Sequence, residues 1–108
     1  MKEVNSIDSI DDFIKENNLA LIYISLEECS VCKVLMPKVE ELLKKYDKIK
    51  SIKVDMDQTP AISGKFSVFT IPTIILFIHG EEYIRESRFI SISELDTKIQ
   101  RYYDIMFK

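Results

Sequence analysis

The sequence predicts an α/β fold, a three-layer sandwich in which a central mixed β-sheet is flanked by helices on both faces. Three observations support it. Apolar runs typical of strands alternate with stretches of helical apolar spacing in the first half of the chain. Two further strand-like runs are then joined by a two-residue turn, and a helical pattern ends the chain. The 108 residues contain no repeat and no linker-like stretch, so we expect a single domain over residues 1–108.

The chain begins with an edge strand, a helix and a buried strand. Val4 is expected in the short edge strand. Residues 9–17 have helical spacing of their apolar side chains, and Ser9 is the predicted N-cap. Residues 19–26 form a continuous apolar run with β-branched and aromatic members. Such a run predicts a central strand covered on both faces.

The middle of the chain predicts a long helix, a strand and a short helix. Residues 30–46 place apolar side chains on one helical face, and Pro37 inside this stretch should bend the axis. Residues 49–54 alternate apolar and polar side chains, which is typical of a strand. The Thr-Pro pair at 59–60 predicts an N-cap and first helical position, with Gly64 as the helix stop.

The last third predicts a hairpin and a terminal helix. Residues 73–78 form a second strongly apolar strand, and residues 82–87 should return antiparallel to it. The His-Gly pair at 79–80 suits the two-residue turn between them, because glycine tolerates positive φ and histidine does so better than most residues. Ser91 followed by Glu94 forms a capping box for the final helix.

The two cysteines, Cys29 and Cys32, are the most informative residues of the sequence. If the chain is helical from Cys29 onward, they lie on one face a turn apart, with Cα atoms roughly 5–6 Å apart, a distance that suits a disulfide. Cys29 would then stand at a helix start, where free N–H groups favour an anion. Lowering a thiol pKa from about 8.5 to about 7 takes roughly 2 kcal/mol, which a helix terminus can largely supply. The pattern therefore predicts a redox-active dithiol.

Two other interpretations of the cysteine pair remain open. The cysteines could be small buried apolar residues that happen to lie three apart. They could also bind zinc, but such a site needs two further ligands, and the sequence offers no other cysteine and one histidine, His79. We therefore expect no metal, and we expect His79 to be a turn residue.

Composition excludes several classes of function. The formal net charge is −3 and no basic block occurs, so we expect neither nucleic acid nor a membrane as partner. The longest apolar runs are too short to cross a bilayer. Acidic residues follow the start at once and no apolar signal region is seen, so the expected location is cytoplasmic. In that reducing compartment a CxxC pair indicates redox chemistry more than a structural bridge.

Several short motifs occur in a characteristic order. They are Cys29-Ser30-Val31-Cys32 with Pro37 five residues later, Lys53-Val54-Asp55 with Asp57-Gln58-Thr59-Pro60, and Ile71-Pro72-Thr73-Ile74 followed by Gly80. Each is weak alone. In this order and at these separations the chain resembles the thioredoxin family over nearly its whole length.

The resemblance implies a thiol–disulfide oxidoreductase that needs no cofactor. It implies that Cys29 attacks a disulfide and that Cys32 resolves the mixed disulfide. It also implies a cis peptide between Ile71 and Pro72, with the backbone there binding an extended substrate segment. The expected partners are disulfide-containing substrate proteins, with a thioredoxin reductase or a low-molecular-weight thiol as electron donor.

The sequence departs from the family pattern around the motif. Glu28 replaces the tryptophan before it, Ser30 and Val31 replace Gly-Pro within it, Tyr23 replaces a buried acid, Ser51 is expected at the position of that acid's lysine partner, and Arg88 replaces a groove glycine. A tyrosine is a poor general base because its ordinary pKa is high. A second hypothesis is therefore an interaction module of the same fold with weak or no redox activity.

Overall fold

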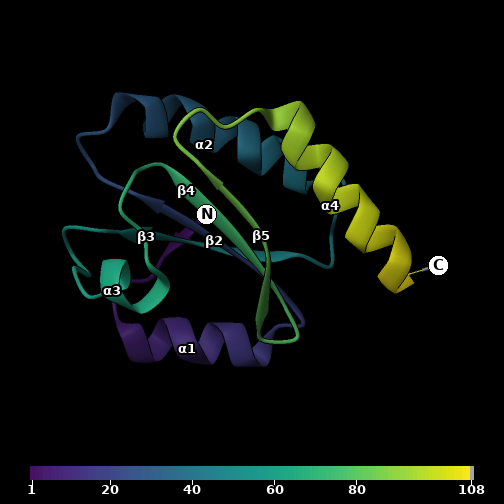
Figure 1. Cartoon of the computed structure of the whole chain (residues 1–108), viewed down its shortest axis with the longest axis horizontal. Coiled ribbons are helices and arrows are strands. Elements are labelled where there is room, and N and C mark those ends of the chain that lie inside the picture. Colours follow the sequence, from purple (N-terminus) through teal and green to yellow (C-terminus); the bar gives the residue numbers. More distant parts are fainter. Residues whose placement is uncertain (108) are drawn as a thin grey trace.

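The computed structural model describes residues 1–107 and shows a five-stranded sheet between two helical layers (Figure 1). The strand order is β1-β3-β2-β4-β5. Helices α1 and α3 lie on one side of the sheet, and α2 and α4 lie on the other. The elements are β1 (Lys2–Glu3), α1 (Ile7–Glu16), β2 (Leu19–Ser25), α2 (Ser30–Leu43), β3 (Lys50–Asp55), α3 (Ile62–Phe66), β4 (Thr73–Ile78), β5 (Glu81–Ser87) and α4 (Ile92–Phe107). The predicted fold class is confirmed.

Strand β2 is the centre of the sheet, and all seven of its residues are buried. It pairs parallel with β3 and antiparallel with β4. Because side chains alternate along a strand, Leu21 and Tyr23 join the core cluster that includes residues of α2 and α4, whereas Ile22 and Ile24 join the cluster that includes residues of α1 and α3. Burial on both faces explains why this run is continuously apolar.

The start of α1 differs from the prediction. Ser6, not Ser9, is the N-cap: its Oγ accepts a hydrogen bond from the Ser9 N–H at 3.0 Å, and the helix begins at Ile7. The edge strand β1 is short, as expected, but it ends at Glu3, so the expectation that Val4 belongs to it is wrong; the Val4 N–H still donates to the Lys53 carbonyl at 2.9 Å.

Helix α2 contains Pro37, as predicted, but it ends at Leu43 and not at residue 46. Tyr46 lies beyond the helix and is still buried. Its ring belongs to the core cluster, and its hydroxyl bonds to α4. It donates to the Asp96 carboxylate and lies 2.9 Å from Oε1 of Gln100. Tyr46 fits the apolar spacing of the helix because it is buried, although it is not part of the helix.

Helix α3 begins and ends later than predicted. The Thr-Pro pair at 59–60 lies in a turn, in which the Ile62 N–H donates to the Thr59 carbonyl at 3.0 Å. Gly64 is inside the helix, and the stop is Ser67, which adopts the left-handed conformation with φ of 53°. A non-glycine residue can take this conformation at a helix end, so the glycine did not mark the boundary.

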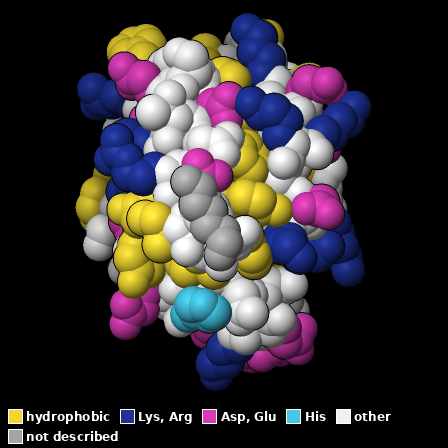
Figure 2. All heavy atoms as spheres, turned by 90° about the vertical axis from the view of Figure 1, so that its right-hand side faces the viewer, with side chains coloured by type: hydrophobic (Ala, Val, Ile, Leu, Met, Phe, Trp, Pro, Cys, Tyr) yellow, Lys and Arg dark blue, Asp and Glu magenta, His cyan; other side chains and the backbone are white. Residues whose placement is uncertain are grey.

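The β4–β5 hairpin has the predicted two-residue turn. His79 and Gly80 have φ of 50° and 84°, which are the positive values such a turn requires. His79 is exposed at the surface, and it is the cyan side chain in Figure 2. Beyond β5, Ser91 caps α4 by accepting a hydrogen bond from the Glu94 N–H at 3.3 Å. No helix within residues 1–107 has the length and apolar character needed to span a bilayer.

Candidate active site

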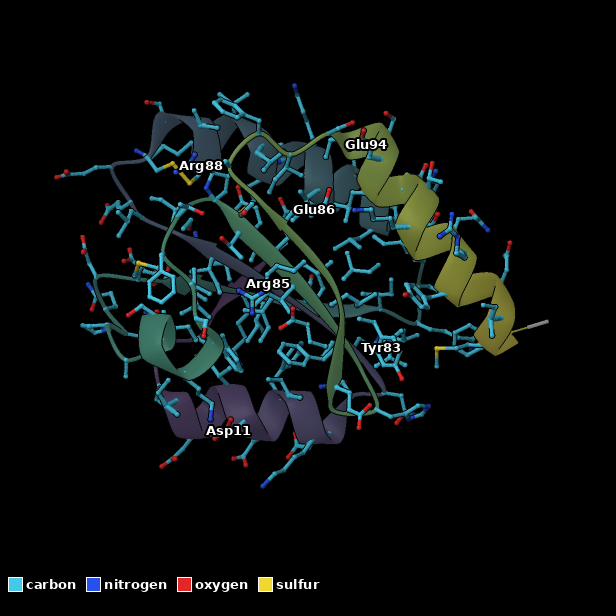
Figure 3. All side chains as sticks on the ribbon, in the orientation of Figure 1. Asp11, Tyr83, Arg85, Glu86, Arg88 and Glu94 are labelled. Atoms are coloured by element: carbon cyan, nitrogen blue, oxygen red, sulfur yellow. A yellow bond between two sulfur atoms is a disulfide. The ribbon has the colours of Figure 1, made fainter. Side chains whose placement is uncertain are left out.

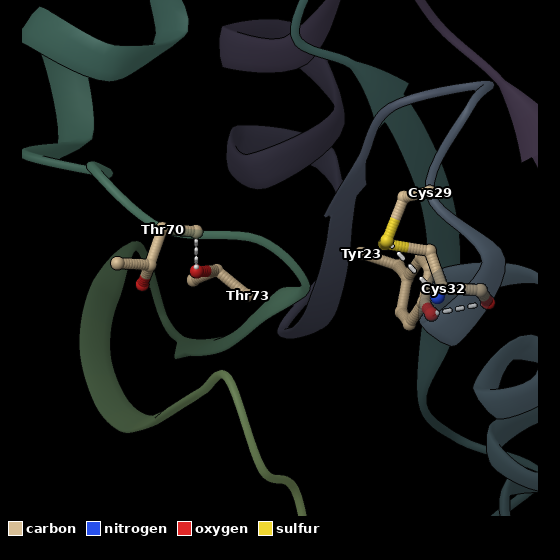
Figure 4. Close-up of a disulfide and its surroundings, with 5 residues drawn as sticks. All are labelled: Tyr23, Cys29, Cys32, Thr70 and Thr73. Atoms are coloured by element: carbon tan, nitrogen blue, oxygen red, sulfur yellow. Dashed lines mark hydrogen bonds between the residues drawn. A yellow bond between two sulfur atoms is a disulfide. The ribbon is translucent and has the colours of Figure 1, made fainter.

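The two cysteines lie at the N-terminus of α2, where β2 leads into the helix. They are joined as a disulfide with their Cα atoms 5.3 Å apart (Figure 4). Cys29 is the N-cap residue, and its Sγ accepts the Cys32 N–H at 3.1 Å. Cys29 is partly exposed, whereas Cys32 is only 2% exposed. An attacking partner can therefore reach the first sulfur more easily than the second.

The electrostatics at Cys29 combine opposing contributions. The cap position places Sγ against free N–H groups and the positive end of the helix dipole, which favours a thiolate once the pair is reduced. Glu27 and Glu28 precede it in an exposed turn, and their negative charges act in the opposite direction. Because both carboxylates are solvated, the Cys32 N–H, which contacts the sulfur directly, has the stronger effect.

Tyr23 lies in β2 beside the first turn of α2. Its side chain is fully buried, and its hydroxyl donates to the Cys32 carbonyl at 2.7 Å (Figure 4). Burial raises the pKa of Tyr23 from 10.0 to about 12. The hydroxyl is therefore protonated at neutral pH. It fixes the backbone at Cys32 and cannot act as a base there.

The lysine beside Tyr23 is Lys53, so the expectation for Ser51 is wrong. In the parallel β2–β3 pair, Lys53 is the partner of Tyr23, whereas Ser51 is opposite Leu21. The Nζ of Lys53 lies 3.6 Å from Oε1 of Glu3 on β1. Strand register sets this neighbour, and a two-residue shift along β3 keeps the same alternation of side chains, so the pattern alone could not distinguish the two positions.

A cavity of about 460 Å³ lies next to Cys32. It is lined by Glu3, Ser25, Leu26, Glu27, Cys32, Lys33, Met36, Pro37, Glu40, Lys53, Asp55 and Gln58. Sequence analysis did not place the charged members beside Cys32, because they come from β1, the β2–α2 turn, α2 and the β3 end. The signal that could have found them is topological: the carboxyl ends of parallel strands meet at one edge of a sheet. The cavity gives Cys32 a polar, charged surrounding on this side.

The peptide between Ile71 and Pro72 is cis. Thr73, which follows, donates its hydroxyl to the Thr70 carbonyl at 2.7 Å (Figure 4). Ile71 packs against the core cluster that contains Cys32. The Pro72 carbonyl accepts the Arg88 N–H at 2.9 Å, which ties this segment to the loop after β5.

The β5–α4 loop brings Arg88 to the two residues between the cysteines. Arg88 is exposed and has a left-handed backbone, with φ of 65° (Figure 3). It lines a surface groove together with Ser30 and Val31 of the motif. Glu28 does not line this groove and lies in the exposed turn before Cys29. The structure thus places four of the singled-out positions together: Ser30, Val31 and Arg88 at the groove, and Pro72 through its bond to Arg88.

This arrangement defines a class of protein. A partly exposed sulfur that can form a reversible bond to a buried neighbour can transfer two electrons without any bound group. Within residues 1–107, no group of three or more His, Cys, Asp or Glu side chains could hold a metal ion. The site is that of a thiol–disulfide oxidoreductase.

Comparison with known proteins gives the family. The family model named Thioredoxin matches residues 3–101. The thioredoxin-like protein YdfQ of Bacillus subtilis is 38% identical over 103 residues, which is 95% of this chain and 92% of that protein. A thioredoxin of Chlamydia trachomatis is 34% identical over 100 residues, with coverage of 93% and 94%. The solved structure of Plasmodium falciparum thioredoxin superposes with a TM-score of 0.85 at 29% identity, covering 94% of this chain and 99% of that chain. The chain belongs to the thioredoxin family.

Proposed function

We propose that this protein reduces disulfides of other proteins in the cytoplasm, with Cys29 as the attacking and Cys32 as the resolving residue. The observation that carries the proposal is the unequal exposure of the pair: Cys29 is partly exposed at the N-cap of α2, and Cys32 is 2% exposed behind it. A buried resolving thiol cannot compete for the incoming disulfide, but it lies close enough to attack the captured sulfur.

The exchange proceeds in two balanced steps. The Cys29 thiolate attacks one sulfur of the substrate disulfide, and a mixed disulfide forms while the other substrate sulfur leaves as a thiolate and takes up a proton. Cys32 then loses its proton and attacks Sγ of Cys29. The second substrate sulfur leaves, and the Cys29–Cys32 disulfide remains. Two electrons have passed from the protein to the substrate.

The proton of Cys32 needs an acceptor other than Tyr23. The Tyr23 hydroxyl, with a pKa of about 12, donates to a carbonyl and accepts no proton at neutral pH. The charged cavity beside Cys32, whose lining includes Glu3 and Lys53, supports transfer of this proton to water there. Resolution should therefore be slower than in a protein with a buried acid at this position.

The substrate strand binds along Ile71 and Pro72. Two observations support this: Ile71 packs against the cluster that contains Cys32, and the Pro72 carbonyl accepts the Arg88 N–H, which holds the segment in place. An extended substrate backbone can add to such a fixed segment in the manner of a β-strand. Electrons return from a thioredoxin reductase or from a low-molecular-weight thiol, which the cytoplasm supplies.

The test is capture of the mixed disulfide. Cys32→Ser cannot complete the second step, so it should accumulate disulfide-linked adducts with substrate proteins through Cys29, visible on non-reducing gels and lost on reduction. Cys29→Ser is the matched control and should form none, because the remaining thiol is buried. The wild-type protein should also reduce 2-hydroxyethyl disulfide with dithiothreitol as the electron source. Absence of both adducts and turnover would refute the proposal.

A second candidate function is a binding module of the same fold with weak or no exchange. The observation that favours it is Tyr23, which replaces the buried acid by a group that cannot accept a proton. In that case partners would bind Cys29→Ser and wild type equally, and no adduct would depend on Cys29.

A further inference from the structure

A surface groove of about 610 Å³ lies beside the dithiol, between α2 and the β5–α4 loop. It is lined by Ser30, Val31, Val34, Leu35, Lys38, Arg88, Phe89, Ile90 and Ser91. Two members of the motif contribute to it, so a molecule bound in the groove would adjoin Cys29. Figure 3 labels Arg88 in the loop after β5.

The groove exposes large apolar side chains. Val31 and Val34 are 60% and 62% exposed, and Phe89 is 96% exposed. Val31 and Val34 lie three positions apart on α2, and Lys38 continues the same helical face one turn further on. Exposed apolar residues that are scattered singly are ordinary, whereas a contiguous apolar patch marks an interaction site. The apolar side chains gathered beside the motif therefore indicate a binding surface.

The charged side chains of the groove are all positive. Lys38 and Arg88 line it, and no Asp or Glu does, although the whole chain has a net charge of −3. Among residues 1–107, neither of the two cations forms an ion pair. A positive, apolar groove on an acidic protein complements a negative and apolar ligand.

The backbone of Arg88 supports a role for its side chain. A left-handed conformation at a long non-glycine residue costs of order 1 kcal/mol, and glycine would avoid that cost. Strain of this kind is typical of functional loops, where the side chain has a use that offsets it.

We propose that this groove selects substrates by a segment next to their disulfide that carries a large apolar side chain and an acidic side chain. The apolar side chain packs between Val34 and Phe89, and the carboxylate pairs with Arg88 and Lys38. The inference rests on the proposed function, since it names the substrate class of the same dithiol. The occupant is a protein segment, because the groove meets the motif at Ser30 and Val31 and combines exposed apolar side chains with two cations, which an acidic and apolar peptide complements.

The experiment uses three disulfide peptides that differ only beside one cysteine. The first carries Phe and Glu, the second carries Phe and Lys, and the third carries Ala and Glu. Wild type should reduce the Phe-Glu peptide with a kcat/KM about tenfold above that of the Phe-Lys peptide and about fivefold above that of the Ala-Glu peptide. The preference for Glu should shrink in 0.5 M salt, because the pairing charges are at the surface.

Matched variants assign the preference to the groove. The double change Lys38→Glu and Arg88→Glu should reverse the preference, so that kcat/KM for the Phe-Lys peptide exceeds that for the Phe-Glu peptide. Phe89→Ala should make kcat/KM for the Phe-Glu and Ala-Glu peptides nearly equal. Arg101→Glu alters an exposed arginine of α4 outside the groove and should leave both ratios and the reduction of 2-hydroxyethyl disulfide unchanged.

Each result decides between outcomes. Ratios near one in wild type, or ratios that the groove variants leave intact, overturn the selection. Failure to reduce 2-hydroxyethyl disulfide overturns the proposed function instead. In that event, NMR titration with the cysteine-free Phe-Glu peptide still tests the groove: shifts at Val31, Val34 and Phe89 support it, and their absence contradicts it.

Discussion

Tyr23 shows how one buried side chain limits the chemistry available beside the dithiol. Its hydroxyl donates to the Cys32 carbonyl at 2.7 Å in the protein interior. A protonated phenol holds the backbone of the first turn of α2, and in the proposed exchange the Cys32 proton must leave by another route. The position therefore stabilises the helix start and supplies no base.

The raised pKa of Tyr23 predicts an alkaline transition. A folded pKa of about 12 against an ordinary value of 10.0 means that the stabilising contribution of this residue is complete below pH 10 and is lost as the pH rises through 12. The chain has no tryptophan, so tyrosinate absorbance at about 295 nm is unobstructed. Tyr23→Phe should remove one component titrating near pH 12. A missing component near pH 10 instead would show that the hydroxyl is not buried as described.

Arg88 and Gly80 should respond to substitution in opposite directions. Both have positive φ, 65° and 84°, but only Gly80 is the residue type that adopts it without strain. Arg88→Gly should raise the free energy of unfolding by about 1 kcal/mol, and Gly80→Ala should lower it by about 1 kcal/mol. No heavy atom beyond its chain neighbours lies within 4 Å of a Cβ built at Gly80, so that loss would be conformational.

Urea denaturation measures both changes. If Arg88→Gly destabilises the protein, the arginine side chain makes a stabilising contact that outweighs the strain. If it stabilises the fold while weakening the preference for acidic peptides, Arg88 is retained for binding at a cost in stability.

At the scale of elements, periodicity predicted which segments are helices and strands, and local chemistry predicted their ends less well. The hairpin turn at His79 and Gly80 and the cap at Ser91 were correct because their side-chain requirements are specific. The start of α1 was wrong because Ser6 and Ser9 are both good caps one turn apart. Which of the two serines caps the helix depends on how α1 packs against the sheet, and this packing is not visible in the local sequence.

The cap assignment of α1 gives a direct prediction. Ser6→Ala removes the side-chain acceptor for the Ser9 N–H and should lower the free energy of unfolding by about 1 kcal/mol. Ser9→Ala keeps that N–H and its acceptor, so it should cost less than half as much. Urea denaturation of the two variants compares them; equal losses would mean that the cap at Ser6 contributes little.

The site was predictable to the extent that its residues are adjacent in sequence. Cys29 and Cys32 could be identified because the helix places them together, and their surroundings could not. Lys53 needed the strand register, and the groove partner Phe89 needed the course of the loop after β5. These contacts join segments far apart in the chain, and no local pattern encodes them.

At the scale of the whole molecule, α4 is held to α2 by a small polar network. Asp96 of α4 accepts hydrogen bonds from Lys45 and Tyr46, which lie just after α2. The Lys45 ammonium first, and the Tyr46 hydroxyl second, hold the pKa of Asp96 below its usual range. The network lies beyond the C-terminal end of α2, whereas the dithiol lies at the N-terminal end of the same helix.

The lowered pKa of Asp96 predicts acid sensitivity. A carboxylate whose folded pKa is depressed contributes stability above its ordinary pKa of about 3.9 and loses it as the pH falls through the folded value. Asp96→Asn should therefore lower the urea midpoint at pH 7, and the difference from wild type should shrink below about pH 4. Asp57→Asn, which removes an exposed carboxylate outside this network, is the control and should show no such pH-dependent difference. A constant difference at all pH values would assign the effect of Asp96 to packing.

The order of the sheet has a consequence for self-association. Its outermost strands are β1 and β5, and an open edge of a sheet is a template on which a second chain could polymerise. β1 is two residues long and consists of Lys2 and Glu3, and β5 begins with the exposed pair Glu81 and Glu82. A strand from a second chain that paired with either edge would have to lie beside these charged side chains. Both borders of the sheet thus discourage fibril growth, and the apolar strands remain confined to the middle.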